Sequence, residues 1–415
     1  MPRRKPSYLL HKSTGQARVR INGQDHYLGT YGSPESRARY AELVEAWFEG
    51  SGGVARRQLT IDGLCVLYMQ HAQKHYRKNG RQTDEVNNIR VALRHVVAGF
   101  GTMRARDFGP KALKLTREAM IKAGCVRASI NRMISRIKGM FRWAVAEELI
   151  PPENLVALQA LTGLRYGRTE ARESAPVLPV PTEDIEAIQP FVSRQVWAMI
   201  QLQILTGARP GEIVIMRGAD LNRQASTWEY RPRSHKTEHH HRSRVIFLGP
   251  RAQELVSGFL KADPEAYLFS PADAERERDA ERRRNRQTPM TPSQRARRPL
   301  RRPRRTPGQY YRVSAYGQAI RKACETAFEM PQELRNVSQS LPVNQQKNLR
   351  ERARQWRKDH CWHPHQLRHN AGTELRRHFG IEAARVVLGH ASAVTTEIYA
   401  ERDESRAREI MSKIG

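Results

Sequence analysis

Apolar residues recur at three- and four-residue steps through most of the segment from about Leu59 to Leu161. This spacing places them along one side of a helix, and it is clearest in the stretches Val91–Val97 and Ile130–Ala144. The pattern therefore predicts a bundle of helices with a core of its own, which we assign to residues 57–165.

The first 50 residues follow a different pattern. Short apolar runs at Tyr8–Leu10, Ala17–Ile21 and His26–Leu28 are separated by turn-forming residues, which is typical of antiparallel strands. Ser33 and Pro34 then supply an N-cap and a first helical residue. We predict a small three-stranded module with one helix over residues 1–50.

The C-terminal part alternates helical patterns with one hairpin-like segment. Thr227–Arg231 and Arg244–Leu248 have the character of paired strands. A proline-containing stretch, Tyr166–Pro181, precedes this part and is typical of a linker. Residues 175–415 are therefore assigned to one larger domain, and the fold class is mainly α with small β-sheets (α+β).

Net charge indicates more about the protein's partners than its overall composition does. Lys and Arg number 72 against 42 Asp and Glu, which leaves a formal net charge of +30. A surplus of this size attracts polyanions. It indicates a nucleic acid partner, against the alternative of a ribosomal-type or generally adhesive basic protein.

About one third of that surplus is concentrated in an insertion. Residues 276–305 hold 13 Arg, no Lys and three acidic residues, with prolines and few large apolar side chains. Such a segment cannot build a core, and we expect a disordered basic loop that contacts DNA backbone. The polar stretch Gln332–Lys358 has some helical character and receives no functional interpretation.

The four cysteines are far apart and form no CxxC pair, which argues against a disulfide framework and a structural zinc site. No apolar run has the length of a signal peptide core or of a membrane span. We expect a cytoplasmic protein, associated with the nucleoid when bound to DNA, with no membrane, no metal and no cofactor.

Two cationic residues stand out in the first half of the C-terminal domain. Arg209 precedes Pro210, so it is expected at a helix start, where a phosphate would meet backbone amides as well as a guanidinium. Lys236 lies between the two predicted strands, where a mobile ammonium can act as a proton donor. A turn arginine and a solvated lysine are the alternatives.

Four further candidates follow between residues 363 and 403. The i, i+3 spacing places His365 and Arg368 on one helical face. Gly389 ends a helix, so His390 comes directly after a turn, and Tyr399 lies on a last short helix. Two imidazoles, a guanidinium and a phenol suit chemistry on a phosphate.

These motifs resemble those of the tyrosine recombinases, the phage integrase family. They read TGARPGE around Arg209, HKT at Lys236, HQLRH at His365 to His369, LGH ending at His390, and TTEIYAE around Tyr399. They occur in the family's order and with its nine-residue separation of His390 and Tyr399. The Arg-rich insertion and the polar stretch before His363 depart from the pattern.

The resemblance implies a helical core-site-binding domain, a mixed α/β catalytic domain and an N-terminal module that binds arm-type DNA sites. It also implies a site-specific recombinase that cleaves DNA through a 3′-phosphotyrosyl link. The six site residues are those that match the motifs: Arg209, Lys236, His365, Arg368, His390 and Tyr399.

Partners follow from the same resemblance. We expect double-stranded attachment sites, a homo-tetramer on DNA that is monomeric off DNA, and DNA-bending accessory proteins as candidates. Two alternatives stay open at this point: a type IB topoisomerase, which uses a similar phosphate pocket and tyrosine, and a decayed integrase that binds DNA without cutting it.

Overall fold

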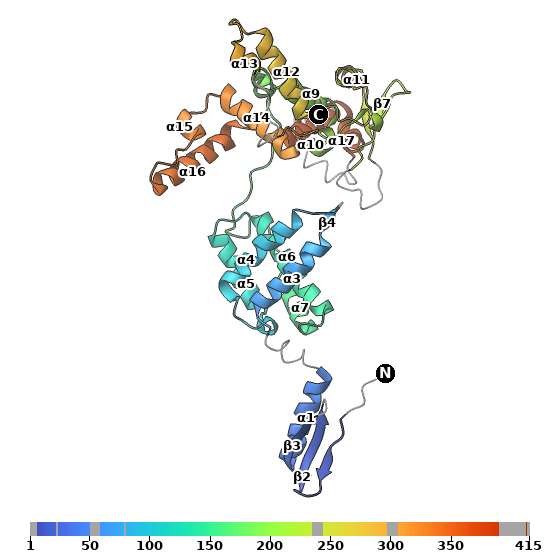
Figure 1. The fold of residues 1–415 in the computed structure, drawn as a ribbon, viewed down its shortest axis with the longest axis vertical. Coiled ribbons are helices and arrows are strands. Elements are labelled where there is room, and N and C mark those ends of the chain that lie inside the picture. The colour runs from blue at the N-terminus through green and yellow to red at the C-terminus, as the bar shows by residue number, and fades with distance from the viewer. Residues whose placement is uncertain are drawn as a thin grey trace. The chain divides into compact units, whose positions relative to one another are not determined.

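The computed structural model describes residues 6–21, 24–49, 59–78, 80–234, 244–296, 306–389 and 412. The chain divides into two units, Met1–Ala175 and Pro176–Gly415 (Figure 1). Each unit has its own hydrophobic cores, and the two are described separately.

The first unit begins with an antiparallel sheet in the order β1-β2-β3, covered by a helix. The elements are β1 (Leu9–His11), β2 (Gln16–Ile21), β3 (Gln24–Thr30) and α1 (Pro34–Glu49). Ala17, Val19 and Leu28 form its small core, because alternate positions of β2 face the helix. The predicted three strands and helix are confirmed.

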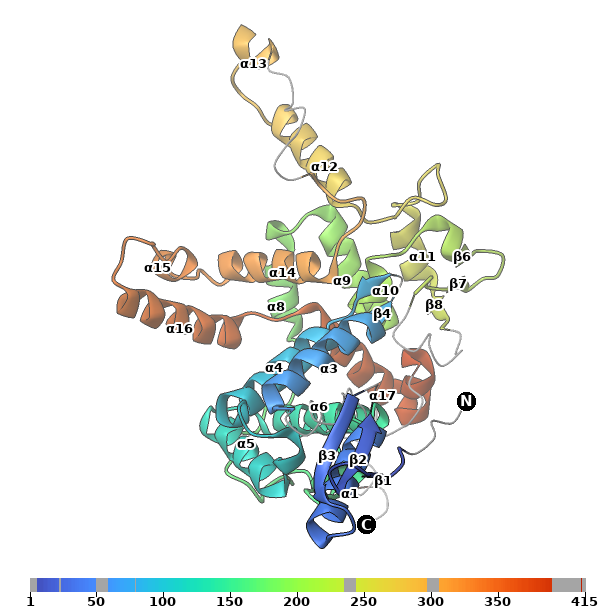
Figure 2. The same ribbon diagram turned by 60° about the horizontal axis from the view of Figure 1, so that its bottom comes forward.

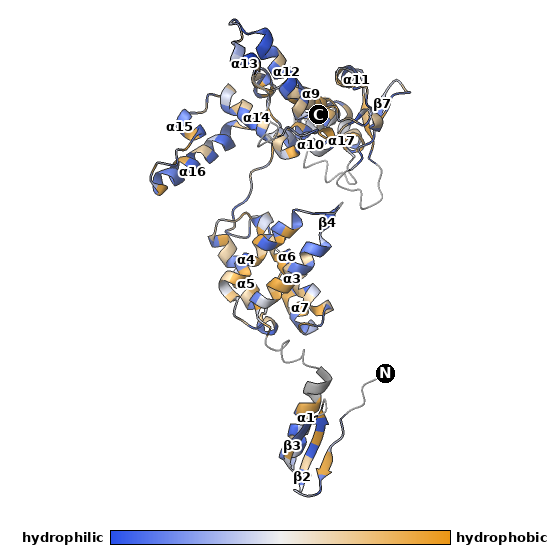
Figure 3. Ribbon diagram, in the orientation of Figure 1, coloured by the Kyte–Doolittle hydropathy of each residue, from blue (hydrophilic) through white to orange (hydrophobic). Residues whose placement is uncertain are grey.

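A helical bundle follows in the same unit. Its elements are α3 (Ile61–His75), β4 (Arg77–Lys78), β5 (Arg81–Gln82), α4 (Glu85–Phe100), η1 (Ala105–Asp107), α5 (Pro110–Lys122), α6 (Arg127–Ala146) and α7 (Pro152–Gln159). Figure 3 shows apolar residues along these helices. The predicted bundle is confirmed, and the sequence pattern did not indicate the short β4–β5 hairpin.

The two faces of helix α6 have different environments. Its apolar positions, from Ile130 to Ala144, are buried in the core of the bundle. On the other face, Arg136 is paired with Glu85 at 2.6 Å and Lys138 donates to a backbone carbonyl. Arg132 and Arg142 stay exposed, so only part of the basic face is open to a partner.

The second unit is built around helix α9 (Arg194–Thr206). Eight of its thirteen residues are buried, because helices pack against it on several sides. The elements that precede the sheet are α8 (Thr182–Ala187), η2 (Gln189–Phe191), α9, α10 (Pro210–Ile213) and η3 (Gly218–Asp220).

A small antiparallel sheet lies beside this helix, in the order β6-β7-β8. Its strands are β6 (Leu221–Asn222), β7 (Trp228–Tyr230) and β8 (Ile246–Leu248). Tyr230 pairs with Ile246 in the ladder, which confirms the predicted hairpin on either side of residues 235–243. Those nine residues lie outside the described part of the chain.

The remaining helices complete the unit. They are α11 (Pro250–Ser257), α12 (Pro271–Arg284), α13 (Pro292–Ala296), α14 (Val313–Ala327), α15 (Gln332–Arg335), α16 (Val343–His360) and α17 (Pro364–Leu388). Figure 2 shows α12 and the α14–α16 group projecting from the part that holds α9 and α17. None of the helices in the described ranges combines the length and apolar character that a bilayer span requires.

The expectation of a disordered loop over residues 276–305 is wrong for its first part. Helix α12 continues through Arg284, with Ser270 as N-cap and Pro271 in the first turn. Asp273 lies in the first turn and three arginines in the last, which complements the helix dipole. Acidic residues alternate with arginines one turn apart, so the repulsion between the arginines is reduced.

Candidate active site

Arg368 connects two ends of helices in the second unit. It lies in α17 with no exposed surface. Its Nη1 donates to the carbonyl oxygen of Gly207 at 2.6 Å, and its Nη2 donates to that of Leu388 at 2.7 Å. Gly207 ends α9 and Leu388 ends α17. Arg368 therefore holds together the turn before Arg209 and the turn before His390.

The turn at Gly207 requires glycine. Its φ of +62° is in the left-handed region, and a Cβ there would lie 2.5 Å from Leu388 Cδ2. The absent side chain lets the end of α17 approach the end of α9. The close approach brings Arg209 and the last residues of α17 into the same region.

Arg209 is the N-cap of α10, as the sequence predicts. Its backbone N–H donates to Glu212 Oε2 at 2.8 Å, and its Nη1 donates to Glu212 Oε1 at 3.0 Å. About a fifth of the side chain is exposed, so the guanidinium is accessible.

These contacts correct one expectation about the helix start. A phosphate was expected to meet backbone amides there, but the carboxylate of Glu212 already accepts the amide of Arg209. Helix α10 is also only four residues long and contributes little dipole. The contribution of Arg209 to phosphate binding therefore rests on its side chain.

Glu212 also pairs with a residue that the sequence interpretation missed. Arg244 Nε lies 3.6 Å from Glu212 Oε1, and both side chains are buried. Arg244 Nη1 also donates to the carbonyl oxygen of Val387 at 3.3 Å. Burial lowers the pKa of the Arg244 guanidinium, and the charge of Glu212 opposes that shift. Arg244 thus connects the segment directly before β8 with the end of α17.

One of these two residues had a sequence signal. Glu212 is the third residue after the N-cap Arg209, where acidic residues commonly cap helices. Arg244 is one of many arginines, and only its burial and its position next to Glu212 distinguish it.

The histidines of α17 have different environments. His365 is half-buried on the helix that carries Arg368, and its ring centroid lies 6.1 Å from that of His369. Burial, followed by the nearby His365, His363 and Arg368, lowers the pKa of His369 to about 4. His369 is therefore neutral at physiological pH, which fits the structural role predicted for it.

Lys236, His390 and Tyr399 lie outside the described residues. The structure places the segments next to Lys236 and His390: β7 and β8 on either side of residues 235–243, and Gly389, with a φ of +66°, directly before His390. Of the six predicted site residues, Arg209, His365 and Arg368 are described, and all three belong to the second unit.

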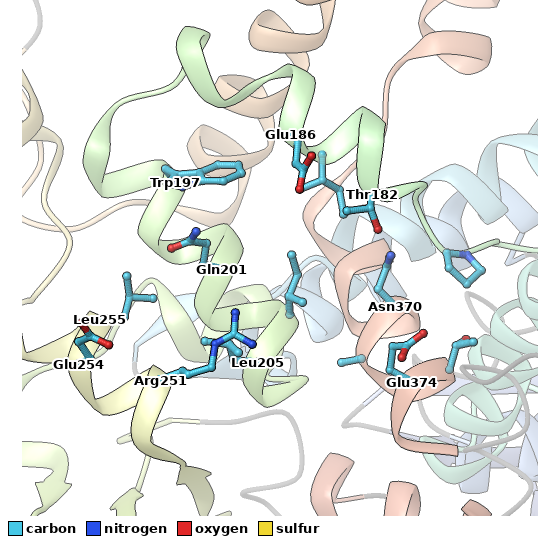
Figure 4. Close-up of a pocket in the computed structure, with 15 residues that line it drawn as sticks. Thr182, Glu186, Trp197, Gln201, Leu205, Arg251, Glu254, Leu255, Asn370 and Glu374 are labelled. Carbon is cyan, nitrogen blue, oxygen red and sulfur yellow. The ribbon is translucent and has the colours of Figure 1, made fainter. Parts of the chain in front are cut away.

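A pocket beside these helices is a different feature. It has a volume of about 740 Å³ and is bordered by α8, α9, α11 and α17 (Figure 4). Trp197 and Leu205 contribute apolar surface, while Glu254 and Glu374 contribute negative charge. None of the three described candidates lines it, and its three carboxylates outnumber its one arginine, Arg251, so that its net charge would repel a phosphate. Within the described ranges, no cluster of three or more His, Cys, Asp or Glu residues is placed to hold a metal ion.

Comparisons with known proteins agree with the motif-based interpretation. Residues 332–406 match the model of the phage integrase family. A comparison with curated proteins finds no match.

Solved structures share the fold across most of the chain. The Tn1549 transposon integrase in complex with transposon right end DNA is 14% identical with a TM-score of 0.52, and the match covers 86% of this chain and 99% of that one. A lambda integrase dimer bound to a COC′ core site is 13% identical with a TM-score of 0.52, and the match covers 97% of each chain. The family match over residues 332–406 and the fold shared with these two integrases agree with the resemblance of the motifs to the phage integrase family.

Proposed function

We propose that the protein is a site-specific recombinase that cuts and rejoins DNA through a 3′-phosphotyrosyl bond to Tyr399. The observation that carries the proposal is the bond between Arg368 and Gly207, which brings two arginines distant in sequence to one junction. Arg209 follows Gly207 by two residues, and His390 follows Leu388, the second carbonyl partner of Arg368, by two.

The two arginines suit a phosphodiester under attack. Such a group carries one negative charge, and attack builds more charge on its non-bridging oxygens. Guanidinium groups at Arg209 and Arg368 would stabilise that charge increasingly toward the transition state. Arg368 has no exposed surface in this structure, so its contact with phosphate requires the guanidinium to become accessible when DNA binds.

Proton transfers are assigned to the other residues. A free tyrosine has a pKa of about 10, so only about one molecule in a thousand is ionised at neutral pH. His365 accepts the phenol proton as the oxygen of Tyr399 attacks phosphorus. Lys236 gives a proton to the departing 5′ oxygen, and His390 donates a hydrogen bond to the phosphate.

The covalent bond explains how strands can be rejoined. The phosphotyrosyl ester retains the energy of the broken phosphodiester, so a 5′ hydroxyl can reverse the reaction without ATP. Exchange between two duplexes breaks four strands, and each protomer supplies one tyrosine. A homo-tetramer on DNA is therefore part of the proposal, with protomers that are monomeric off DNA and DNA-bending proteins as candidate accessories.

The first unit is assigned to DNA recognition. The helical bundle would bind the core site, with the exposed Arg132 and Arg142 of α6 as candidates for backbone contact. The N-terminal sheet would bind arm-type sites. On that sheet, Arg18 and Arg20 both lie close to Asp25, so DNA would compete with this carboxylate for them.

The deciding test uses a nicked suicide substrate that carries the candidate attachment site. The full-length protein should form a denaturation-resistant adduct with the DNA, and Tyr399→Phe should abolish it. Tyr166→Phe, which changes an exposed tyrosine of the first unit, serves as the matched control and should retain the adduct. An equal amount of adduct from Tyr399→Phe would overturn the assignment of the nucleophile.

A plasmid assay separates this proposal from its alternatives. Recombinant products that depend on the attachment site support a recombinase. Relaxation of supercoils without a sequence requirement or strand exchange would indicate a topoisomerase. DNA binding without any adduct would indicate a decayed integrase.

A further inference from the structure

Helices α14, α15 and α16 form an arm with a small core of its own. Tyr316 and Ile320 of α14 belong to the main core of the unit, whereas Met330, Leu334 and Ala353 form a separate cluster. Ala353 is the single buried residue among the 18 residues of α16. Figures 1 and 2 both show α14 and α16 side by side. A long helix with this little buried surface indicates a role outside core packing.

Five guanidinium groups border one pocket on this arm. The pocket has a volume of about 470 Å³, and three helices contribute to its wall. The arginines are Arg321 of α14, Arg335 of α15, and Arg350, Arg354 and Arg357 of α16. Figure 3 shows how hydrophilic α16 is as a whole.

Two nearby carboxylates leave this charge largely uncompensated. Glu325 lies 2.6 Å from Arg357 and 3.7 Å from Arg321. Glu351 pairs with Arg354 at 2.5 Å. Five positive charges against these two negative charges leave a local surplus of three. Like charges this close destabilise the arm unless an anion joins them.

The other two arginines contact neutral groups among the described residues. Arg350 donates to the side-chain oxygen of Gln346 at 3.0 Å, and Arg335 donates to the backbone carbonyl of Glu325. The Nε of Arg335 is buried, and no hydrogen-bond acceptor for it lies within the described ranges. Guanidinium groups whose contacts are with neutral groups can pair with phosphate oxygens, which accept two hydrogen bonds from one arginine.

We propose that this arginine pocket, defined by the five arginines above, binds the DNA phosphodiester backbone outside the cleavage site. Arg350, Arg354 and Arg357 follow one another at i, i+4 and i+7, so they form a row about 10 Å long on one face of α16. Phosphates of one strand advance by about 3.4 Å along the duplex axis, so the row matches a run of nucleotides better than a single small anion.

The position in the chain supports flanking DNA as the ligand. Helix α16 ends at His360, and α17, which carries His365 and Arg368, begins at Pro364. DNA backbone bound to the arm would therefore belong to the duplex that leads to the proposed active site. The inference rests on the proposed function for the identity of that DNA, but its test measures binding and does not require cleavage.

The test compares two double variants of the full-length protein. Arg350→Gln with Arg354→Gln removes two charges from the arginine pocket. Lys347→Gln with Lys358→Gln removes two charges from the same helix at positions that do not line the pocket. DNA affinity is measured by fluorescence anisotropy over a salt series, with one duplex limited to the core site and one extended by flanking DNA.

We expect the pocket variant to flatten the salt dependence on the extended duplex. The slope of log K against log salt should fall by about 2, so the affinity lost between 50 and 200 mM salt should be about tenfold smaller than for wild type. The lysine variant should keep the wild-type slope. Arg350→Lys with Arg354→Lys, which keeps the charge, should restore most of it.

Three results would overturn the proposal. If the Arg350→Gln/Arg354→Gln and Lys347→Gln/Lys358→Gln variants lose the same slope, net charge alone explains the effect. If neither variant loses slope, the pocket does not contact DNA. Thermal stabilisation by pyrophosphate that the pocket variant loses, with DNA binding unchanged, would make the ligand a free phosphate compound. If no adduct forms with Tyr399 but the pocket variant behaves as expected, the proposed function fails and the pocket assignment holds.

Discussion

Arg368 and Gly207 are joined by a 2.6 Å hydrogen bond across 161 residues of sequence. The bond requires a left-handed glycine at the end of α9 and a buried guanidinium in the first half of α17. It holds the turn that leads to Arg209 next to the turn that leads to His390. Two motifs that are far apart in the chain thereby become parts of one candidate site.

We predict that Gly207→Ala lowers both stability and cleavage. An alanine in the left-handed conformation lowers the free energy of unfolding by about 1–2 kcal/mol. Its Cβ would also collide with the buried Leu388 side chain, which lowers it by about 1–3 kcal/mol more. A displaced Leu388 would also move the carbonyl that holds Arg368. Urea unfolding and the adduct assay measure the two effects.

Gly167→Ala is the control for that prediction. Gly167 has a similar φ of +68°, and a Cβ there would meet nothing within 4 Å. The Gly167→Ala variant should lose only the stability that the left-handed backbone conformation costs, and it should form the adduct normally. Equal losses of stability in both variants would contradict the packing argument.

Replacing Glu212 by Gln should be strongly destabilising. It leaves the buried Arg244 without its carboxylate, and it replaces one of the two oxygens that accept hydrogen bonds from Arg209 by an NH2 group that cannot accept. Breaking a buried ion pair from one side costs about 3–5 kcal/mol. Chemical unfolding should show this loss, whereas Glu382→Gln, which removes an exposed partner of Arg385, should change stability by less than about 1 kcal/mol.

Acidification should destabilise the second unit through His369. Its pKa is about 4 in the folded protein, below the value of about 6.5 for an unfolded chain, so the unfolded state binds the proton more readily. This contribution is complete above about pH 6.5 and is lost as the pH falls toward 4. Between pH 7.5 and pH 5 it amounts to about 2 kcal/mol.

Unfolding measurements at these two pH values check that prediction. His369→Gln should reduce the difference in stability between them, because glutamine takes up no proton. A variant as sensitive to pH as the wild type would show that other groups cause the acid effect.

The arginines after α12 should contribute to DNA binding. Residues 286–305 contain eight arginines and no acidic residue. Replacing these eight by Gln, and leaving α12 with its anchoring contact between Asp273 and Lys261, should weaken DNA affinity and flatten its salt dependence by several units of slope. If the slope of log affinity against log salt, measured by fluorescence anisotropy, is the same in variant and wild type, this segment does not contact DNA.

Local patterns were sufficient to predict most elements of the fold. Apolar spacing in α6, the turn residues of the N-terminal sheet and the Arg209-Pro210 helix start depend on neighbours a few residues away, so the sequence shows them directly. The motifs also marked the six candidate residues, because their types and order resemble those of the phage integrase family.

Tertiary structure decided the contacts between distant segments. The buried pair of Glu212 and Arg244, and the bonds from Arg368 to Gly207 and Leu388, join side chains or carbonyls that no local pattern relates. The arginine pocket likewise appears only when α14, α15 and α16 pack together. Burial is the physical reason: it makes an ion pair or a hydrogen bond matter, and it depends on which segments meet in space.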